Sequence, residues 1–344
     1  MSTVSRVLRW ESVLGLLCVA VFVFGTTSTA GFAEQGNLSF LLLDYTEVAL
    51  LAFALVPIIL TGEIDLSVAS VLGFCSALTG ALWDAGLSFE AIVPLVLLAG
   101  IVLGSVNAVL IVRFGLPSLA VTIGTLGLYR GLAYVILGDR AVTGFPENYR
   151  PLATDSLGFL PYAAIVVLVV GLAIATLVHL TPIGRSLYAI GLGERTARFS
   201  GIRVDRVKMA LYLLSGGLAA LASLIYTLRY NSARADNANG MELVAVAAVL
   251  LGGVSIFGGR GTVAGVALAL LAMAGLRNLL FLDDVSNEIQ NVITGLLLIL
   301  SVLVPVLVKP RRTKDVPLES SSVDSERRTG ADPDSRLRRD HEGV

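Results

Sequence analysis

The feature that most constrains this chain is a succession of strongly apolar segments, each close to the length of a membrane span. A helix rises about 1.5 Å per residue, so about 20 apolar residues cross a hydrocarbon core about 30 Å thick. Such segments lie at residues 12–32, 39–60, 65–83, 90–112, 117–137, 162–181, 208–229, 242–257, 262–281 and 288–308. The sequence therefore predicts an all-α integral membrane protein with about ten transmembrane helices in one bundle.

The composition argues against a water-soluble enzyme. Hydrophobic residues make up 55% of the 344 positions and charged residues only 15%, with a mean hydropathy of +0.82. Soluble domains carry far more charge than this. Cys18 and Cys75 lie within apolar segments, and neither forms a motif with His179 or His341. We therefore expect no metal site and no functional cysteine.

The distribution of Lys and Arg predicts the orientation, because positively charged residues are retained on the cytoplasmic side. With both termini inside, the cytoplasmic connections hold Arg6, Arg9, Arg113, Arg185, Arg195, Arg198, Arg203, Arg206, Lys208, Arg260, Lys309, Arg311 and Arg312, and the outer ones hold Arg140, Arg150 and Arg234. We expect a cytoplasmic N-terminus at 1–11 and a transmembrane domain at 12–308, which includes a cytoplasmic loop at 182–207. A disordered cytoplasmic tail follows at 309–344. Alternatively, the first segment is a cleaved signal.

A short polar break interrupts the apolar pattern at residues 61–67. In one interpretation, Gly62 ends one helix and Asp65 caps the next. In the other, the break lies partly within the membrane, where irregular backbone is tolerated only if protein or water satisfies it. Glu63 and Asp65 would then face a translocation pathway.

Hydroxyl groups recur on one face of the segment at 117–137. Thr122, Thr125 and Tyr129 are spaced by three and four residues, which places them on the same side of a helix. These hydroxyls could bind a sugar, or they could equally bond to the backbone of their own or a neighbouring helix. The same segment contains three glycines that we expect to allow close helix contact: Gly124, Gly127 and Gly131.

The longest inside loop, at 182–207, contains a predicted two-turn helix. Glu194 and Arg198 stand at an i, i+4 spacing, and Gly201 is a plausible helix stop. A helix this short is unstable alone in water, so it must pack on its own bundle or on a partner. The alternative is a basic loop attracted to anionic lipid headgroups.

The segment from Glu242 to Gly265 is rich in small residues. Gly259, Gly261 and Ala264 match a dinucleotide-binding spacing, but the apolar run that follows leaves no room for a second strand. The three lysines of the chain lie outside any phosphate-binding loop of the GxxxxGK[ST] kind, and no HExxH or GxSxG motif occurs. We therefore expect no enzyme activity and no cofactor in this chain.

Three of these segments, in this order, resemble the permeases of the ribose, xylose and rhamnose branch of bacterial ATP-binding cassette importers. Residues 62–70 are similar to the family's "GGIDLSVGS", residues 181–202 to "T..GR..YAIG.N..AA..SGI", and residues 242–265 to "EL.AIAAV.LGG.S..GG.GTV.G". The resemblance runs from about residue 40 to 308 and looks closest to rhamnose-type members. The departures are Glu63 and Ala69, where the family usually has glycines, and Gly193 and Thr196 in the inside loop.

The resemblance implies a membrane-spanning permease for a monosaccharide, a pentose or a deoxyhexose such as rhamnose, in the bacterial cytoplasmic membrane. It implies three kinds of protein partner: a second permease copy or paralogue, cytoplasmic ATP-binding cassette subunits that use the ATP, and an extracytoplasmic sugar-binding protein. It also implies contact with membrane lipid and none with nucleic acid. The candidate pathway residues are Glu63, Asp65, Thr122, Thr125, Tyr129 and Glu242. The candidate coupling residues for the ATPase are Arg185, Gly191, Glu194, Arg195, Ala197, Arg198 and Gly201.

Two alternatives remain. An ion-coupled secondary transporter would also lack an ATP motif and would carry ionisable groups at mid-membrane. The predicted spans hold few of these apart from Asp44, Glu47, Arg130 and Arg277. Arg130 lies roughly 10 Å from the outer end of its span, so we expect a polar partner or cavity for it. A permease for branched-chain amino acids would need a site for a zwitterion.

Overall fold

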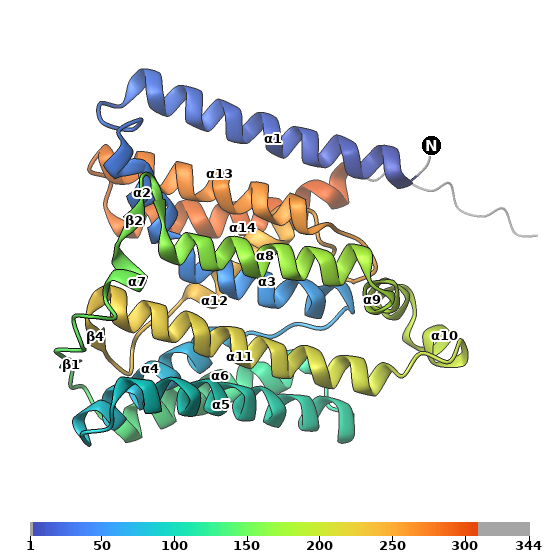
Figure 1. The fold of residues 1–344 in the computed structure, drawn as a ribbon. Coiled ribbons are helices and arrows are strands. Elements are labelled where there is room, and N and C mark those ends of the chain that lie inside the picture. The colour runs from blue at the N-terminus through green and yellow to red at the C-terminus, as the bar shows by residue number, and fades with distance from the viewer. Residues whose placement is uncertain (1–2, 309–344) are drawn as a thin grey trace, which may run out of the picture. The chain divides into compact units, whose positions relative to one another are not determined.

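The computed structural model describes residues 3–308, and the predicted tail at 309–344 lies outside them. Helices dominate, as predicted (Figure 1). They are α1 (Thr3–Ser28), α2 (Gln35–Asp44), α3 (Thr46–Leu60), α4 (Val68–Asp84), α5 (Phe89–Ala108) with the π-helical turn η1 (Val109–Arg113), α6 (Ser118–Leu137), α7 (Pro151–Thr154), α8 (Tyr162–Leu180), α9 (Pro182–Leu192), α10 (Glu194–Phe199), α11 (Val204–Tyr230), α12 (Met241–Leu251), α13 (Val263–Leu282) and α14 (Asn287–Val308). Two antiparallel strand pairs join β1 (Val142–Thr143) to β4 (Ser232–Ala233) and β2 (Ser156–Leu157) to β3 (Leu160–Pro161).

Six helices within residues 3–308 are long and apolar enough to cross a membrane, and α2 with α3, bent by 43°, adds a seventh if the pair is one span. Helices α4 and α12 are apolar but shorter. The structure therefore confirms an all-α membrane protein but not a count near ten. The predicted spans at 65–83 and 242–257 begin or end in irregular backbone, because residues 61–67 and 252–262 form turns and extended segments instead of helix.

Helix α3 forms the centre of the bundle. Every residue from Thr46 to Leu60 is buried, and α8, α11 and α12 pack against it. Helix α1 lies at the edge of the bundle along α13 (Figure 1). Large apolar side chains remain exposed on the outer helices, for example Leu98, Val135 and Val169. Such an exterior suits lipid contact.

Close helix packing occurs between α5 and α11 rather than where the sequence predicts it. A Cβ added at Gly216 would lie 2.1 Å from the carbonyl oxygen of Gly100, and one at Gly104 would lie 2.2 Å from that of Tyr212. These glycines let the two backbones touch, as in other membrane helix pairs. Among the described residues of this chain, the predicted glycines of α6 make no such contact, because a Cβ there would meet no atom within 4 Å: Gly124, Gly127 and Gly131.

The two ends of the bundle differ in structure. The strand pairs and α7 lie at one end, and α9 and α10 lie at the other (Figure 1). The predicted inside loop at 182–207 is therefore opposite the loops predicted to be outside. This arrangement agrees with the predicted alternation of inside and outside connections.

Candidate functional site

The break between α3 and α4 is the first component of the candidate site. The N–H of Gly62 donates to Ile59 O (2.9 Å), and Gly62 then takes a φ of 82°, which ends the helix. Asp65 is only 3% exposed. Its Oδ1 accepts from the N–H (2.9 Å) and hydroxyl (2.6 Å) of Ser67, and its Oδ2 accepts from the hydroxyl of Ser215 on α11 (3.1 Å). These donors compensate the buried carboxylate and fix the first turn of α4.

A chain of polar groups continues from this break into the bundle. Asn107 on α5 donates from Nδ2 to the Ser67 hydroxyl (2.8 Å). The Tyr129 hydroxyl on α6 donates to Leu103 O (2.9 Å) and lies 3.3 Å from Asn107 Oδ1. Tyr129 and Asn107 are essentially fully buried. The chain of bonds therefore links α4, α5 and α6 through groups that water cannot satisfy.

The predicted hydroxyl face of α6 does point into the bundle. Thr122 is fully buried, and its hydroxyl lies 2.9 Å from Ser118 O and 3.3 Å from Ile64 O in the break. Thr125 is 5% exposed and lies 3.4 Å from Thr122 O. In this structure the hydroxyls thus contact backbone of their own helix and of the neighbouring break.

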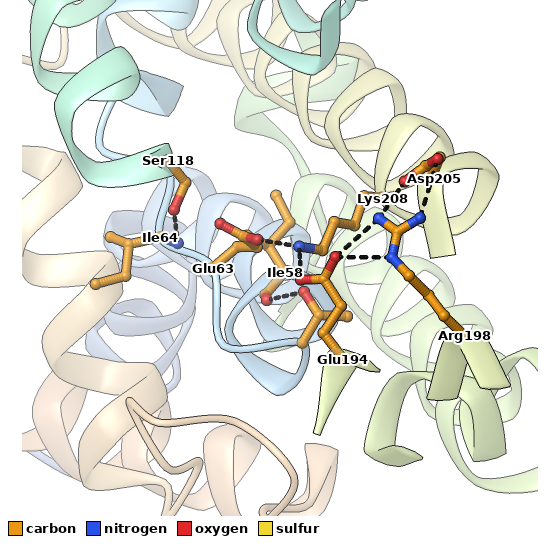
Figure 2. A network of polar contacts seen from close by, with 9 residues as sticks. Ile58, Glu63, Ile64, Ser118, Glu194, Arg198, Asp205 and Lys208 are labelled. Atoms are coloured by element: carbon orange, nitrogen blue, oxygen red, sulfur yellow. Dashed lines mark hydrogen bonds and ion pairs between the residues drawn. The ribbon is translucent and has the colours of Figure 1, made fainter. Parts of the chain in front are cut away.

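A cluster of five charged side chains joins the break to the inside loop (Figure 2). Lys208, near the start of α11, contacts Glu63 of the break and also donates to Glu194 Oε2 of α10 at 2.8 Å. Arg198 donates from Nη2 to Glu194 Oε1 (2.8 Å) and to Asp205 Oδ1 (2.5 Å). We call these five residues the charge cluster.

The charge cluster also determines the protonation of its α10 members. The hydrogen bond from Lys208, with those from Arg198, holds the pKa of Glu194 below its usual range. Hydrogen bonds to Asp205 and Glu194 raise the pKa of Arg198 further. Glu194 therefore stays ionised at neutral pH.

A cavity of about 230 Å³ lies beside the charge cluster. Its polar wall includes Glu63, Glu194 and Lys208, and Ser118 at the start of α6 lies opposite. The Ser118 hydroxyl accepts from the N–H of Ile64 at 3.2 Å, so α6 also holds the break (Figure 2). The cavity thus lies where the break, α10 and α11 meet η1 and the 115–118 segment.

The three sequence segments that carry the family resemblance meet at a glycine junction, formed by Gly62, Gly191, Gly258 and Gly259. A Cβ added at Gly191 would lie 2.1 Å from Leu60 O and 2.3 Å from Gly259 N. One added at Gly258 would lie 2.7 Å from Gly62 N, and the N–H of Gly259 donates to Leu60 O at 2.9 Å. The end of α3, the end of α9 and the loop after α12 are therefore in direct backbone contact.

Helix α10 forms as predicted, with one side packed on its own chain. Ala197 is 2% exposed and packs with Ile190 and Val204. Gly201 takes a φ of 82° and ends this segment. Phe199, in contrast, is 92% exposed. Two further predicted coupling residues, Arg185 and Arg195, are also exposed.

Arg130 has the polar partner that its position requires. Its guanidinium donates to Ala235 O and Asn237 O, both at 2.7 Å, and to Ala69 O at 3.3 Å. Glu242, at the start of α12, interacts with it electrostatically. Arg130 and Glu242 therefore lie with the 231–240 loop, and Arg130 also contacts the first turn of α4 at Ala69.

A second group of charged side chains lies in α2, α3, α11 and α13, and of these Arg229 and Glu47 are buried. Arg229 donates to Asp44 Oδ1 (3.0 Å) and Glu47 Oε2 (3.1 Å), and Arg277 lies 3.7 Å from Asp44. Asp44, Glu47 and Arg277 stand out in the sequence as ionisable residues within predicted spans, whereas Arg229 was not predicted to take part. Lys208 was predicted only as an inside charge, although it is the one lysine among residues 1–308, a signal that the sequence contains.

Comparison with known proteins identifies relatives over most of the chain. Residues 37–302 match the family model described as "Branched-chain amino acid transport system / permease component". The chain is 34% identical over 301 residues to the autoinducer 2 import system permease protein LsrD of Yersinia enterocolitica, covering 86% of this chain and 91% of the relative. The protein of that name from Photorhabdus luminescens is 33% identical over 304 residues, covering 86% and 90%. No solved structure matches the chain.

Proposed function

Because the chain belongs to the family of branched-chain amino acid transport system permease components, we propose that it forms the translocation pathway of an ATP-driven importer for a small, neutral, hydroxyl-rich molecule such as a monosaccharide. The chain is a multi-pass membrane protein related to bacterial inner-membrane permeases of ATP-binding cassette transporters, and it is a transport subunit rather than an enzyme. We propose the chemical class of the cargo and the residues that couple this chain to the ATPase.

The pairing of the buried charges carries the proposal of a neutral cargo. Within the described spans, Arg229 is paired with Asp44 and Glu47, and Arg130 is held by backbone carbonyls. Asp65 has three donors from Ser67 and Ser215. A zwitterionic amino acid would need a free carboxylate and a free cation for its two charged groups, since a buried unpaired charge is costly.

The hydroxyl-bearing residues near the break support a sugar as cargo. Thr122, Thr125 and Tyr129 line one face of α6 next to Glu63 and Asp65. If the break rearranges during transport, their hydroxyls exchange backbone partners for the hydroxyls of a monosaccharide at little cost in hydrogen bonding. The monosaccharide, a pentose or a deoxyhexose such as rhamnose, is our proposal, and the two relatives described above are named for autoinducer 2 import.

The inside loop supports coupling to a separate ATPase. Helix α10 presents the exposed ring of Phe199 beside the exposed Arg195, and an aromatic ring next to Arg is typical of interface anchors. The same helix contacts the break through the charge cluster. In our proposal cytoplasmic ATP-binding cassette subunits dock here, a second permease copy or paralogue completes the pathway, and an extracytoplasmic binding protein delivers the sugar.

Uptake by the reconstituted importer tests the cargo. The chain is placed in proteoliposomes with its partner permease, the ATPase subunits and the binding protein, and labelled rhamnose, ribose, leucine and autoinducer 2 are offered in turn. We expect uptake of one neutral monosaccharide and none of leucine. Uptake of leucine would overturn the neutral cargo, and uptake of autoinducer 2 alone would replace the monosaccharide by the cargo named for the relatives.

A further inference from the structure

We infer that Lys208 is a positioning residue that ties α10 to the α3–α4 break, so that a displacement of α10 by the ATPase moves the backbone of the pathway. The inference rests on the proposed function, because it needs a partner that displaces α10. It goes beyond that function because it assigns the mechanical link between α10 and the break to a single side chain. That side chain lies in the first turns of α11, outside the three segments that carry the family resemblance.

Two carboxylates from distant parts of the chain converge on one ammonium group. Glu63 is 145 positions from Lys208 in sequence, and Glu194 is 14 positions away on another helix. The side chains of Lys208 and Glu63 are only 9% and 15% exposed. Water and salt therefore screen this pair far less than a surface ion pair, and the two contacts form a short path from α10 to the break.

The charge balance makes Lys208 the residue that holds the cluster together. Glu63, Glu194 and Asp205 contribute three negative charges, and Lys208 and Arg198 contribute two positive ones. The cluster thus has a net charge of −1 with Lys208 and −2 without it. Arg198 contacts Glu194 and Asp205 in the described structure, so Lys208 is the cation that Glu63 contacts.

The backbone at Glu63 is suited to receive a displacement. Residues 61–67 are not helical, and Gly62 with a φ of 82° lies directly before Glu63. The two neighbouring residues with polar contacts are held by other helices, Ile64 by Ser118 of α6 and Asp65 by Ser215 of α11. A pull on Glu63 therefore acts on an irregular segment between two rigid helices, where a backbone change is least costly.

The resemblance to the sugar permeases implies a glycine where this chain has Glu63. A glycine at that position offers no carboxylate to Lys208. The other contact between α9–α10 and the break, the glycine junction, involves only backbone atoms and does not depend on charge. The two connections can therefore be separated by substitution.

The test compares Lys208→Met, Glu63→Met and the double variant with wild type in the reconstituted importer. The quantities measured are cargo uptake per ATP hydrolysed and the midpoint of thermal unfolding. The double variant restores the net charge of −1 and leaves Glu194 paired with Arg198, but it lacks the link. Arg206→Met is the matched control, because Arg206 lies two residues before Lys208 and is exposed.

We expect Lys208→Met to lower the unfolding midpoint. We also expect it to reduce uptake per ATP by about fivefold or more, because about fivefold is the smallest effect typical of two coupled sites. The double variant should recover the midpoint but not the uptake per ATP, and Arg206→Met should match wild type. Recovery of both quantities in the double variant would show a purely structural role and overturn the inference, as would unchanged uptake per ATP in Lys208→Met. ATP-driven uptake by the wild type is required for the proposed function, and its absence would contradict that function rather than the role of Lys208.

Discussion

Ala197 and Phe199 lie two residues apart on α10 but face opposite directions. Ala197 is 2% exposed and packs on Ile190 and Val204, whereas Phe199 is 92% exposed. Ala197 therefore stabilises the inside loop on its own bundle, and a charge placed there would disturb the loop whether or not a partner docks. Phe199 is the better probe of docking, since its ring has few contacts to lose within this chain.

We predict that Phe199→Asp weakens binding of the ATPase subunits by about tenfold or more, because an aromatic anchor at an interface typically contributes over 1 kcal/mol. The thermal stability of the isolated chain should not change, since the ring is exposed. Co-purification of the ATPase with the tagged permease measures the effect. Leu157→Asp is the control, because Leu157 is 68% exposed at the opposite end of the bundle. If the ATPase co-purifies equally with wild type, Phe199→Asp and Leu157→Asp, the docking site lies elsewhere.

At the scale of elements, the glycine junction brings the ends of α3 and α9 and the loop after α12 into one place. We predict that Gly191→Ala destabilises the folded chain by about 1–3 kcal/mol, the usual cost of overpacking, because its Cβ would lie 2.1 Å from Leu60 O and 2.3 Å from Gly259 N. Backbone atoms on both sides leave little room to relax.

Gly193→Ala is the matched control for the junction. Its Cβ would meet Thr196 Oγ1 at 3.5 Å, an ordinary contact, and its φ of 174° is extended backbone that alanine also adopts. The midpoint of thermal unfolding in detergent compares the two variants with wild type. If Gly191→Ala and Gly193→Ala unfold together at the wild-type midpoint, the close contact at Gly191 does not hold the elements together.

Local elements of the site were predictable from sequence, and long-range contacts were not. The spacing of Glu194 and Arg198 predicted α10 and their hydrogen bond, and Gly62 predicted the end of α3. The pairing of Lys208 with Glu63 has no local signal, because it joins positions 145 residues apart. The count near ten spans was not confirmed for a related reason: apolar composition does not reveal how far each helix continues before the backbone leaves the helical conformation.

At the scale of the whole chain, the predicted orientation follows from the excess of Lys and Arg at the end of the bundle that holds α9 and α10. We predict that both termini are cytoplasmic. Reporter fusions after Arg9 and after Arg312, the latter beyond the described residues, measure this, with a fusion after Arg150 as the outside control. An external signal from either terminal fusion would require a different number of spans.

In the proposed function, ATP hydrolysis on partner subunits drives this permease, and an ion gradient does not. Cargo accumulation in proteoliposomes, with ATP or with a proton or sodium gradient as the energy source, tests it most directly. We predict accumulation with ATP only when the ATPase subunits are present, and none when a gradient is imposed on the permease alone. Gradient-driven accumulation by the chain without ATPase subunits would contradict the proposed function and identify a secondary transporter.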